Sequence, residues 1–351
     1  MEALHPKLFT ELETKELMRQ LASAHRHLGD LKGRCVAIPN QSILVNTLAL
    51  QEAKDSSAIE SIVTTHDELF QDNLSAESHS PAAKEVRNYV QALRQGWELT
   101  KENGLLTVNH IIEIQSVLES NRAGLRSQAG TTLKDGAGRV VYTPPQRHEE
   151  IVELMGNLER FINDDDFCDL DPLIKMAIIH HQFESIHPFY DGNGRTGRVI
   201  NVLYLMTKGL LDLPILYLSR TINRHKAEYY RLLQEVRDTG NWHAWVLFML
   251  KCVEQTALHT TQTVNQIALA FSDAKALLRR HSFYSHELIN HIFSSPYTKI
   301  EHLAEGLQVS RNTAIKYLEV LCTDGLLEKH KSGRSNYYIH KRLCEILTKN
   351  E

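Results

Sequence analysis

The sequence predicts a mainly helical protein that has one short β-hairpin in its core and a smaller domain of different character at its C-terminal end. Apolar residues recur at three- and four-residue spacing through most of the 351 residues. Glycine and proline are few and lie between these stretches, as expected of helix boundaries. The predicted helices cover residues 42–53, 83–99, 107–119, 148–162, 172–184, 195–208, 226–237, 242–258 and 262–279.

One segment interrupts the helical pattern. Residues 134–145 contain a glycine-rich turn followed by the β-branched and aromatic residues Val140, Val141 and Tyr142, which predicts a short hairpin. It is either a connector or a flap that pairs with an extended peptide of another protein.

The C-terminal part, 281–351, reads as helices over 284–293, 299–306 and 311–323, then a polar turn between apolar stretches at 325–340. This order is typical of a winged-helix domain. Basic residues exceed acidic ones from 299 to 342, which fits either DNA binding or a protein-docking and homodimer surface. The basic and polar residues concerned are Arg311, Asn312, Lys316, Lys329, Lys331 and Arg334.

The bulk composition is that of an ordinary soluble protein, with 42% hydrophobic and 23% charged residues and a net charge of −4. The five cysteines are scattered without CxxC spacing, so neither a disulfide framework nor a zinc site is expected. No secretory signal and no apolar run of membrane-spanning length is visible, so we expect no membrane partner and a cytoplasmic location.

The segment with the most chemistry is His187-Pro-Phe-Tyr-Asp-Gly-Asn-Gly-Arg-Thr-Gly-Arg198. Proline cannot continue a helix, so His187 is expected where one helix ends. The Gly-Asn-Gly turn lets the backbone approach a ligand, and its N–H groups, together with the start of the helix that follows, form a nest for anions.

Charged side chains in this segment extend the argument. Arg195 and Arg198 lie three residues apart in the first turn of the new helix and suit a di- or triphosphate. Asp191 would repel phosphates unless Mg²⁺ lay between them. His187 beside a metal-bound phosphate would serve as a general base. An ordinary tight turn is the alternative, but base, carboxylate, nest and two arginines within twelve residues favour a nucleotide site.

This segment resembles the signature of the Fic family, His-Pro-Phe-x-[Asp/Glu]-Gly-Asn-Gly-Arg-x-x-Arg, at every fixed position. The resemblance extends from about residue 35 to the C-terminal domain and is to bacterial members that have an N-terminal Fic segment and a winged helix. It implies an N-terminal segment (1–100), a Fic core (101–280) and a winged-helix domain (281–351). The implied reaction transfers AMP from ATP to a Ser, Thr or Tyr hydroxyl of a target protein, or of the enzyme itself.

The resemblance also implies roles for single residues. His187 would deprotonate the hydroxyl, Phe189 would anchor the loop and Asp191 would hold Mg²⁺. The ATP site would be completed by an aromatic pair at the adenine and by the flap of residues 140–142 for the target; for the pair, packing in the core is an equally good reading. The implied ATP-binding residues are Asp191, Gly192, Asn193, Gly194, Arg195, Thr196, Gly197, Arg198, Tyr229 and Tyr230.

An inhibitory element is also implied. Ser56-Ser-Ala-Ile-Glu60-Ser61 resembles the family pattern [Ser/Thr]-x-x-x-Glu-[Gly/Asn], except that Ser61 stands at the last position. Glu60 would pair with Arg198 and take the place of a phosphate. A glutamate on an exposed helix face is the alternative.

Other functions stay open at this level. The same fold could remove AMP from a modified protein, with a glutamate such as Glu60 positioning water, or could use another nucleotide. A transcription regulator that binds DNA and only senses a nucleotide is the reading from a different class, but such a sensor would not need His187. The target protein and the side chain that is modified are not specified by the sequence.

Overall fold

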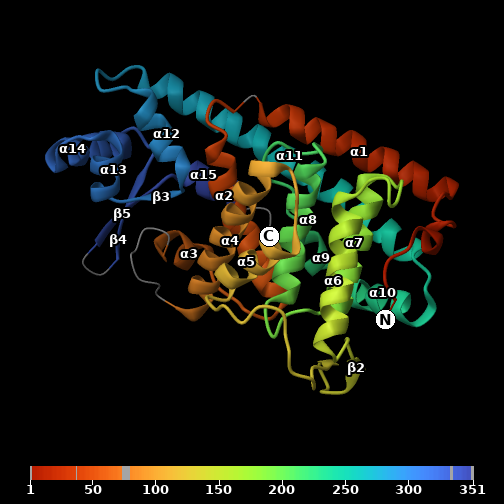
Figure 1. Cartoon of the computed structure of the whole chain (residues 1–351). Coiled ribbons are helices and arrows are strands. Elements are labelled where there is room, and N and C mark those ends of the chain that lie inside the picture. Colours follow the sequence, from red (N-terminus) through yellow and green to blue (C-terminus); the bar gives the residue numbers. More distant parts are fainter. Residues whose placement is uncertain (1, 37, 73–79, 333–334, 349–351) are drawn as a thin grey trace.

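The computed structural model describes residues 2–36, 38–72, 80–332 and 335–348. Within these residues there are fifteen α-helices, a 3₁₀ helix at Pro6–Phe9 and five short strands (Figure 1). The helices are α1 (Lys15–Cys35), α2 (Ser42–Ile59), α3 (His66–Asp72), α4 (Pro81–Asn103), α5 (Val108–Leu118), α6 (His148–Asn163), α7 (Pro172–Ile186), α8 (Asn193–Thr207), α9 (Ser219–Arg224), α10 (Lys226–Thr239), α11 (His243–Leu278), α12 (His286–Ser294), α13 (Ile300–Leu307), α14 (Arg311–Thr323) and α15 (Lys341–Thr348). The mainly helical fold predicted from the sequence is confirmed.

The strands form two small antiparallel sheets. β1 (Leu133–Lys134) pairs with β2 (Val140–Tyr142), which confirms the hairpin predicted in the helical core. In the second sheet, β3 (Tyr297–Thr298) and β4 (Glu328–Ser332) lie on either side of β5 (Ser335–Ile339). Both sheets project from helical bodies rather than forming a layer of their own (Figure 1).

The helices α7 and α8 are the centre of the molecule. Every side chain in α7 from Leu173 to Ile186 is buried, and α8 is buried from Arg195 to Leu205. They pack against each other, while α6 and α11 cover α7, and α2, α4 and α5 cover α8. The loop between α7 and α8 is therefore fixed at both ends by buried helices, which makes it a rigid place for a site.

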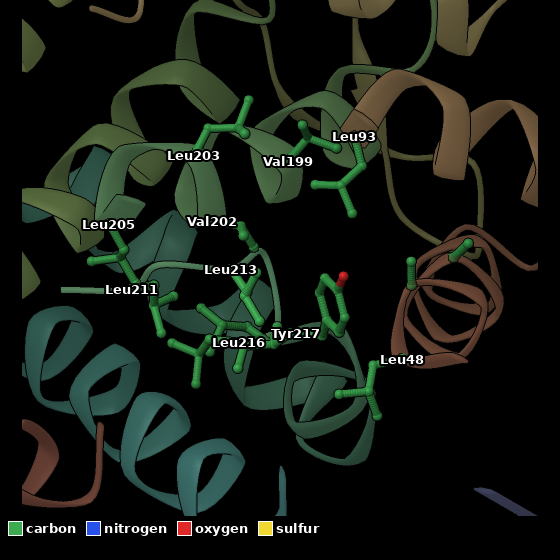
Figure 2. Packing of buried hydrophobic residues seen from close by; sticks show 14 of the residues in the cluster. Leu48, Leu93, Val199, Val202, Leu203, Leu205, Leu211, Leu213, Leu216 and Tyr217 are labelled. Atoms are coloured by element: carbon green, nitrogen blue, oxygen red, sulfur yellow. The ribbon is translucent and has the colours of Figure 1, made fainter. Parts of the chain in front are cut away.

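One hydrophobic cluster ties the N-terminal helices to this centre. In Figure 2, Val199, Val202 and Leu203 of α8 lie close to Leu93 of α4, and the segment after α8 continues the cluster toward Leu48 of α2. All of these side chains are buried. Because α2 is packed into the same core as α8, its C-terminal end is held at a fixed position relative to the start of α8.

The C-terminal part contains the elements that the sequence predicts, in the predicted order: α12, α13 and α14, then the β4–β5 hairpin. A further helix, α15, follows the hairpin. This part packs mainly on α11 and α2. The hydroxyl of Tyr297 donates to Asp67 of α3 over 2.6 Å, and its ring stacks on Phe70 with centroids 5.4 Å apart.

Two helix predictions are wrong. The stretches 242–258 and 262–279 form one helix, α11, because nothing between them breaks a helix. The sequence analysis also overlooks α1, although Leu17, Ala24, Leu28 and Leu31 are buried on one face that lies against α11. Many polar residues lie between these apolar ones, and packing of the apolar face on α11 stabilises the helix. Within the described residues, no helix is long and apolar enough to cross a membrane.

Candidate active site

His187 occupies the junction between α7 and the signature loop. It ends α7 in the left-handed conformation, with φ 49° and ψ 58°, and its N–H donates to the carbonyl of Phe183 over 3.0 Å. Pro188 follows and prevents the helix from continuing. The side chain is half-buried, with its ring at the end of α7. The backbone therefore places the imidazole at one point instead of leaving it on a mobile loop.

Asn193 closes the signature loop. Its Oδ1 accepts the N–H of Phe189 and its Nδ2 donates to the carbonyl of the same residue, both over 2.9 Å. Phe189 is fully buried, which fits the anchoring role expected of it. Gly192 has φ 75°, a conformation that favours glycine, and α8 begins directly after it.

Arg126 supports the loop from behind, and sequence reasoning missed it. Its guanidinium is fully buried and donates from Nε to the carbonyl of His187 over 2.8 Å and from Nη2 to the carbonyl of Pro145. Its own N–H donates to the carbonyl of Pro188 over 2.9 Å. Arg126 thus connects His187 to the chain that leaves the hairpin. No motif marks it in the sequence, because its partners are backbone atoms far along the chain.

Arg195 lies at the start of α8 with 3% of its side chain exposed. Nε donates to Glu60 over 2.9 Å, Nη1 to Glu85 over 2.7 Å, and Nη2 lies 2.9 Å from Glu119. The carboxylates come from three elements: the end of α2, α4 and the end of α5. Nothing in the local sequence indicated Glu85 or Glu119, since each reaches the site only through tertiary packing.

Arg198 lies one turn further along α8 and is equally buried. It donates from Nε to Oγ of Ser56 over 2.7 Å, and from Nη2 to the carbonyl of Ser56 over 3.0 Å and to Glu60 over 2.7 Å. The two oxygens of Glu60 therefore bridge the two arginines of the signature. A phosphate group would make the same pair of contacts.

Glu60 also lies against the glycine turn. A Cβ atom placed on Gly194 would lie 2.6 Å from Oε1 of Glu60, so the carboxylate is pressed on the backbone of that residue. Gly197 is crowded in the same way, because a Cβ there would come within 2.9 Å of Glu184. Neither position has room for a side chain. The place that the sequence analysis assigned to phosphate is filled by the carboxylate of Glu60.

Ser61 ends the helix that carries Glu60. It adopts φ 68°, the left-handed conformation for which glycine or asparagine is normally used. The N–H of Ser61 donates to the carbonyl of Ala58 and the N–H of Ile62 to that of Ser57, both over 3.0 Å, which is the Schellman pattern of helix ends. The serine at the last position of the inhibitory pattern therefore takes the glycine-type conformation, at some cost in backbone strain.

The electrostatics of His187 favour the neutral imidazole. Burial, together with the nearby guanidinium groups of Arg126 and Arg237, lowers its pKa to about 4, while Asp191 acts in the opposite direction. A neutral ring at pH 7 has a lone pair that can accept a proton. This is the protonation state that a general base requires.

The comparison with known proteins agrees with this arrangement. The Fic/DOC family N-terminal model matches residues 18–98, and the Fic/DOC family model matches 105–205, which includes the whole signature. A third model, the C-terminal domain of SoFic-like protein adenylyltransferases, matches 273–343. Together, in chain order, they account for most of the protein.

The chain belongs to the Fic family.

Named relatives support this assignment over part of their length. The protein adenylyltransferase fic-1 of Caenorhabditis elegans is 28% identical over 153 residues, which are 44% of this chain and 28% of the relative. The protein adenylyltransferase Fic of Drosophila melanogaster is 31% identical over 107 residues, 30% of this chain and 20% of the relative. The matched region thus spans less than a third of these relatives.

Solved structures share the fold. A Fic family protein from Desulfovibrio desulfuricans G20 is 21% identical and has a TM-score of 0.57, covering 96% of this chain and 98% of that chain. Fic-1 from C. elegans is 22% identical with a TM-score of 0.54, covering 71% of this chain and 74% of that chain.

Other residues of the Fic signature have distinct surroundings. The side chain of Asp191 is 77% exposed, and its Oδ1 accepts the N–H of Gly192 over 2.7 Å. Thr196 is fully buried behind the turn, so its side chain faces the protein interior. Of these residues, Asp191 alone presents an exposed carboxylate to the mouth of the site.

The aromatic pair divides into a buried and an exposed member. Tyr229 is 2% exposed; its hydroxyl lies 2.8 Å from Nε2 of His180, and its ring packs near Trp245. This favours the core-packing reading for Tyr229. Tyr230 is 49% exposed, with its ring 5.1 Å from that of Tyr229. Only Tyr230 therefore has a surface that a base could stack on.

The hairpin presents its apolar residues outward. Val140 and Val141 are 55% and 46% exposed, which is unusual for a connector of this size. Tyr142 instead anchors the hairpin, because its hydroxyl donates to the carbonyl of Ser185 over 3.0 Å and the guanidinium of Arg237 lies 4.0 Å from its ring centre. The hairpin is thus fixed beside the end of α7, close to His187.

The basic residues of the C-terminal part are largely paired within the chain. Arg311 forms an ion pair with Glu301, and Lys329 lies 2.6 Å from Glu319. These pairs reduce the charge that α14 and the β4–β5 hairpin could offer to a DNA backbone. Arg334, at the tip of the predicted wing, lies outside the described residues.

One large cavity lies away from the signature. It has a volume of about 870 Å³ and lies between α2, α4 and the end of α8, where Trp97 and Arg94 contribute to its wall. No residue of the 187–198 segment lines it. Around the two signature arginines, the carboxylates of Glu60, Glu85 and Glu119 occupy the guanidinium groups instead.

Proposed function

We propose that this Fic protein transfers AMP from ATP to a Ser, Thr or Tyr hydroxyl of a target protein, and to its own chain, and that Glu60 restrains the reaction. The observation that supports this best is the carboxylate of Glu60 bridging Arg195 and Arg198 over the glycine turn, within the same signature as a neutral His187. An anion site, a base and an occupying carboxylate are thereby combined in one place.

The chemistry follows from these positions. His187 would accept the proton of the target hydroxyl, whose oxygen then attacks the α-phosphorus of ATP. The bond from that phosphorus to the bridging oxygen of the β-phosphate breaks, and pyrophosphate leaves with the electron pair. The N–H groups of residues 192–194 and the start of α8 would stabilise the negative charge.

Asp191 is the residue that would hold Mg²⁺. Its exposed carboxylate fits a metal that takes one carboxylate from the protein and its other ligands from phosphates and water. Within the described residues, no group of three or more His, Cys, Asp or Glu is arranged to bind a metal by itself. Mg²⁺ would neutralise phosphate charge next to a carboxylate that otherwise repels it.

Glu60 would restrain the reaction by competing with the terminal phosphates. While it bridges the arginines, ATP cannot place its phosphates on Arg198, so the α-phosphorus is not aligned with an attacking hydroxyl. The exposed Val140 and Val141 would register an extended target segment by strand pairing beside His187.

The test is the intact mass of three proteins after incubation with ATP and Mg²⁺: wild type, Glu60→Gly and Glu60→Gly/His187→Ala. We expect an AMP increment on Glu60→Gly that is at least about tenfold greater than on wild type, and none on the double variant. Glu113→Gly provides the matched control, since that glutamate lies exposed on α5 and contacts Gln95. No increment on Glu60→Gly would refute the proposal.

A chase with AMP-modified protein separates transfer from removal of AMP. Loss of the increment that depends on an intact Glu60 would show the reverse activity. Competition of ATP with UTP, GTP and CTP identifies the nucleotide. DNA binding that responds to ATP and survives His187→Ala would instead support a regulator.

A further inference from the structure

Arg195 and Arg198 differ in how their charges are balanced. Each of the three nitrogens of the Arg195 guanidinium lies 2.7–2.9 Å from a different carboxylate, from Glu60, Glu85 and Glu119. A fourth carboxylate, that of Asp191, lies 4.0 Å from Nη2. Arg198 has one carboxylate partner, Glu60, and otherwise donates to neutral oxygens of Ser56. The two arginines are therefore not equivalent anion ligands.

The difference becomes larger when Glu60 leaves. Arg198 then keeps only the neutral oxygens of Ser56 as hydrogen-bond partners, so its donors are available to a phosphate. The buried carboxyl groups of Glu184 and Glu52 also act on it, but burial raises the pKa of both to about 7.

Arg195 still faces Glu85 on Nη1 and Glu119 on Nη2, and its side chain stays buried. A guanidinium group is planar, and the hydrogen bond from Nη1 to Glu85 together with the ion pair between Nη2 and Glu119 restricts the direction of the plane. The Nε edge would continue to face the place that Glu60 occupied.

Glu119 is itself held rigidly. Its side chain is 13% exposed, and a Cβ on Gly192 would collide with its Oε1, so the carboxylate is packed against the signature turn. Glu85 is more open, with 35% of its side chain exposed, and reaches Arg195 from α4. The carboxylate of Glu119 therefore lies against the signature turn, whereas that of Glu85 approaches Arg195 from α4.

We propose that Glu85 and Glu119 are positioning residues that orient Arg195 so that only its Nε edge is offered to the nucleotide phosphates. This assignment rests on the proposed AMP transfer. Arg198 offers the phosphates the hydrogen-bond donor that Glu60 leaves free, while Arg195 orients them. Glu60 restrains both, because its two oxygens occupy the Nε edge of Arg195 and Nη2 of Arg198.

This division of roles predicts a specific kinetic effect. Removing the charge of Glu119 loosens Arg195, so the phosphates are held less accurately and the chemical step slows. The same change removes a carboxylate that repels the triphosphate, so ATP binds no more weakly. The turnover number should therefore fall while the KM for ATP does not rise.

The test compares Glu60→Gly with Glu60→Gly/Glu119→Gln in steady-state AMP transfer. We expect kcat to fall about tenfold while the KM for ATP changes by less than about threefold. The matched control, Glu60→Gly/Glu113→Gln, removes an exposed carboxylate of the same helix and should equal Glu60→Gly. An unchanged kcat, or a rise in KM that accounts for the loss of rate, would overturn the assignment.

Glu85→Gln in the same background provides a second variant if Glu119→Gln does not fold, as judged by circular dichroism. Because Glu85 is partly exposed, this variant should fold and show the same fall in kcat in weaker form. Equal kcat values for Glu60→Gly with and without Glu85→Gln would contradict the positioning role of Glu85. Absence of AMP transfer by Glu60→Gly itself would instead overturn the proposed function, and the assignment with it.

Discussion

Around His187 the charged groups that act most on the imidazole are two guanidinium groups, whereas around Arg195 they are three carboxylates. The two places lie eight positions apart in one twelve-residue segment. The first keeps a base neutral, and the second keeps a phosphate-binding residue occupied. The comparison teaches that the base and the arginines of the signature have separate electrostatic surroundings, so under the proposed function Glu60 would restrain the reaction without disturbing the base.

The largest effect on the rate should come from a change at His187. In the Glu60→Gly background, His187→Ala should lower the rate of AMP transfer on the order of a thousandfold, the scale of a lost general base. Nucleotide affinity, measured by calorimetry, should stay close to that of Glu60→Gly, because the phosphate-binding end is untouched. Equal losses of rate and of ATP affinity would show that His187 also contributes to nucleotide binding.

The next largest effect should come from Arg126, which holds the loop behind His187. Arg126→Gln leaves three backbone carbonyls without their charged donor and should lower the free energy of unfolding by about 3 kcal/mol. Urea unfolding measures this change. Arg122→Gln, a change at an exposed arginine in the same loop, should stay within about 0.5 kcal/mol of wild type. A small effect of Arg126→Gln would mean that the loop is held by α7 and α8 alone.

The pH dependence of kcat/KM tests the surroundings of His187 directly. Because the pKa of His187 is lowered to about 4, the acid limb of kcat/KM for Glu60→Gly should lie well below pH 6.5. The unfolded chain binds this proton first, so the fold loses stability as pH falls from 6.5 toward 4. Circular dichroism at each pH separates the two effects. An acid limb at 6.5 in a folded enzyme would contradict the shift.

The smallest effect should come from a change at Ser61, next to the carboxylate that contacts the two arginines. Ser61→Gly relieves a left-handed serine after Glu60 and should stabilise the inhibitory helix by about 1 kcal/mol. Basal AMP transfer by the otherwise wild-type chain should fall about fivefold, since Glu60 leaves its arginines less often. Ser61→Ala, which keeps the strain, is the control. A higher rate for Ser61→Gly than for Ser61→Ala would show that flexibility, not helix stability, governs release.

Local pattern was enough for much of the fold. The starts of α7 and α8 follow from Pro172 and Gly192, and the hairpin follows from the turn before Val140. Two outcomes were predicted incorrectly. The helix α11 is continuous because no residue between its two predicted parts breaks a helix, and α1 is stabilised by packing on α11.

The sequence by itself determined the chemistry on offer: a histidine before proline, a glycine turn, two arginines one turn apart and a glutamate at the end of a preceding pattern. Only the tertiary structure decided which groups balance them. Arg126, Glu85 and Glu119 reach the signature from segments 61 to 110 positions away, and burial sets the pKa of His187. Local spacing specifies a helix end or a turn, but charge partners and desolvation depend on which distant segments pack together.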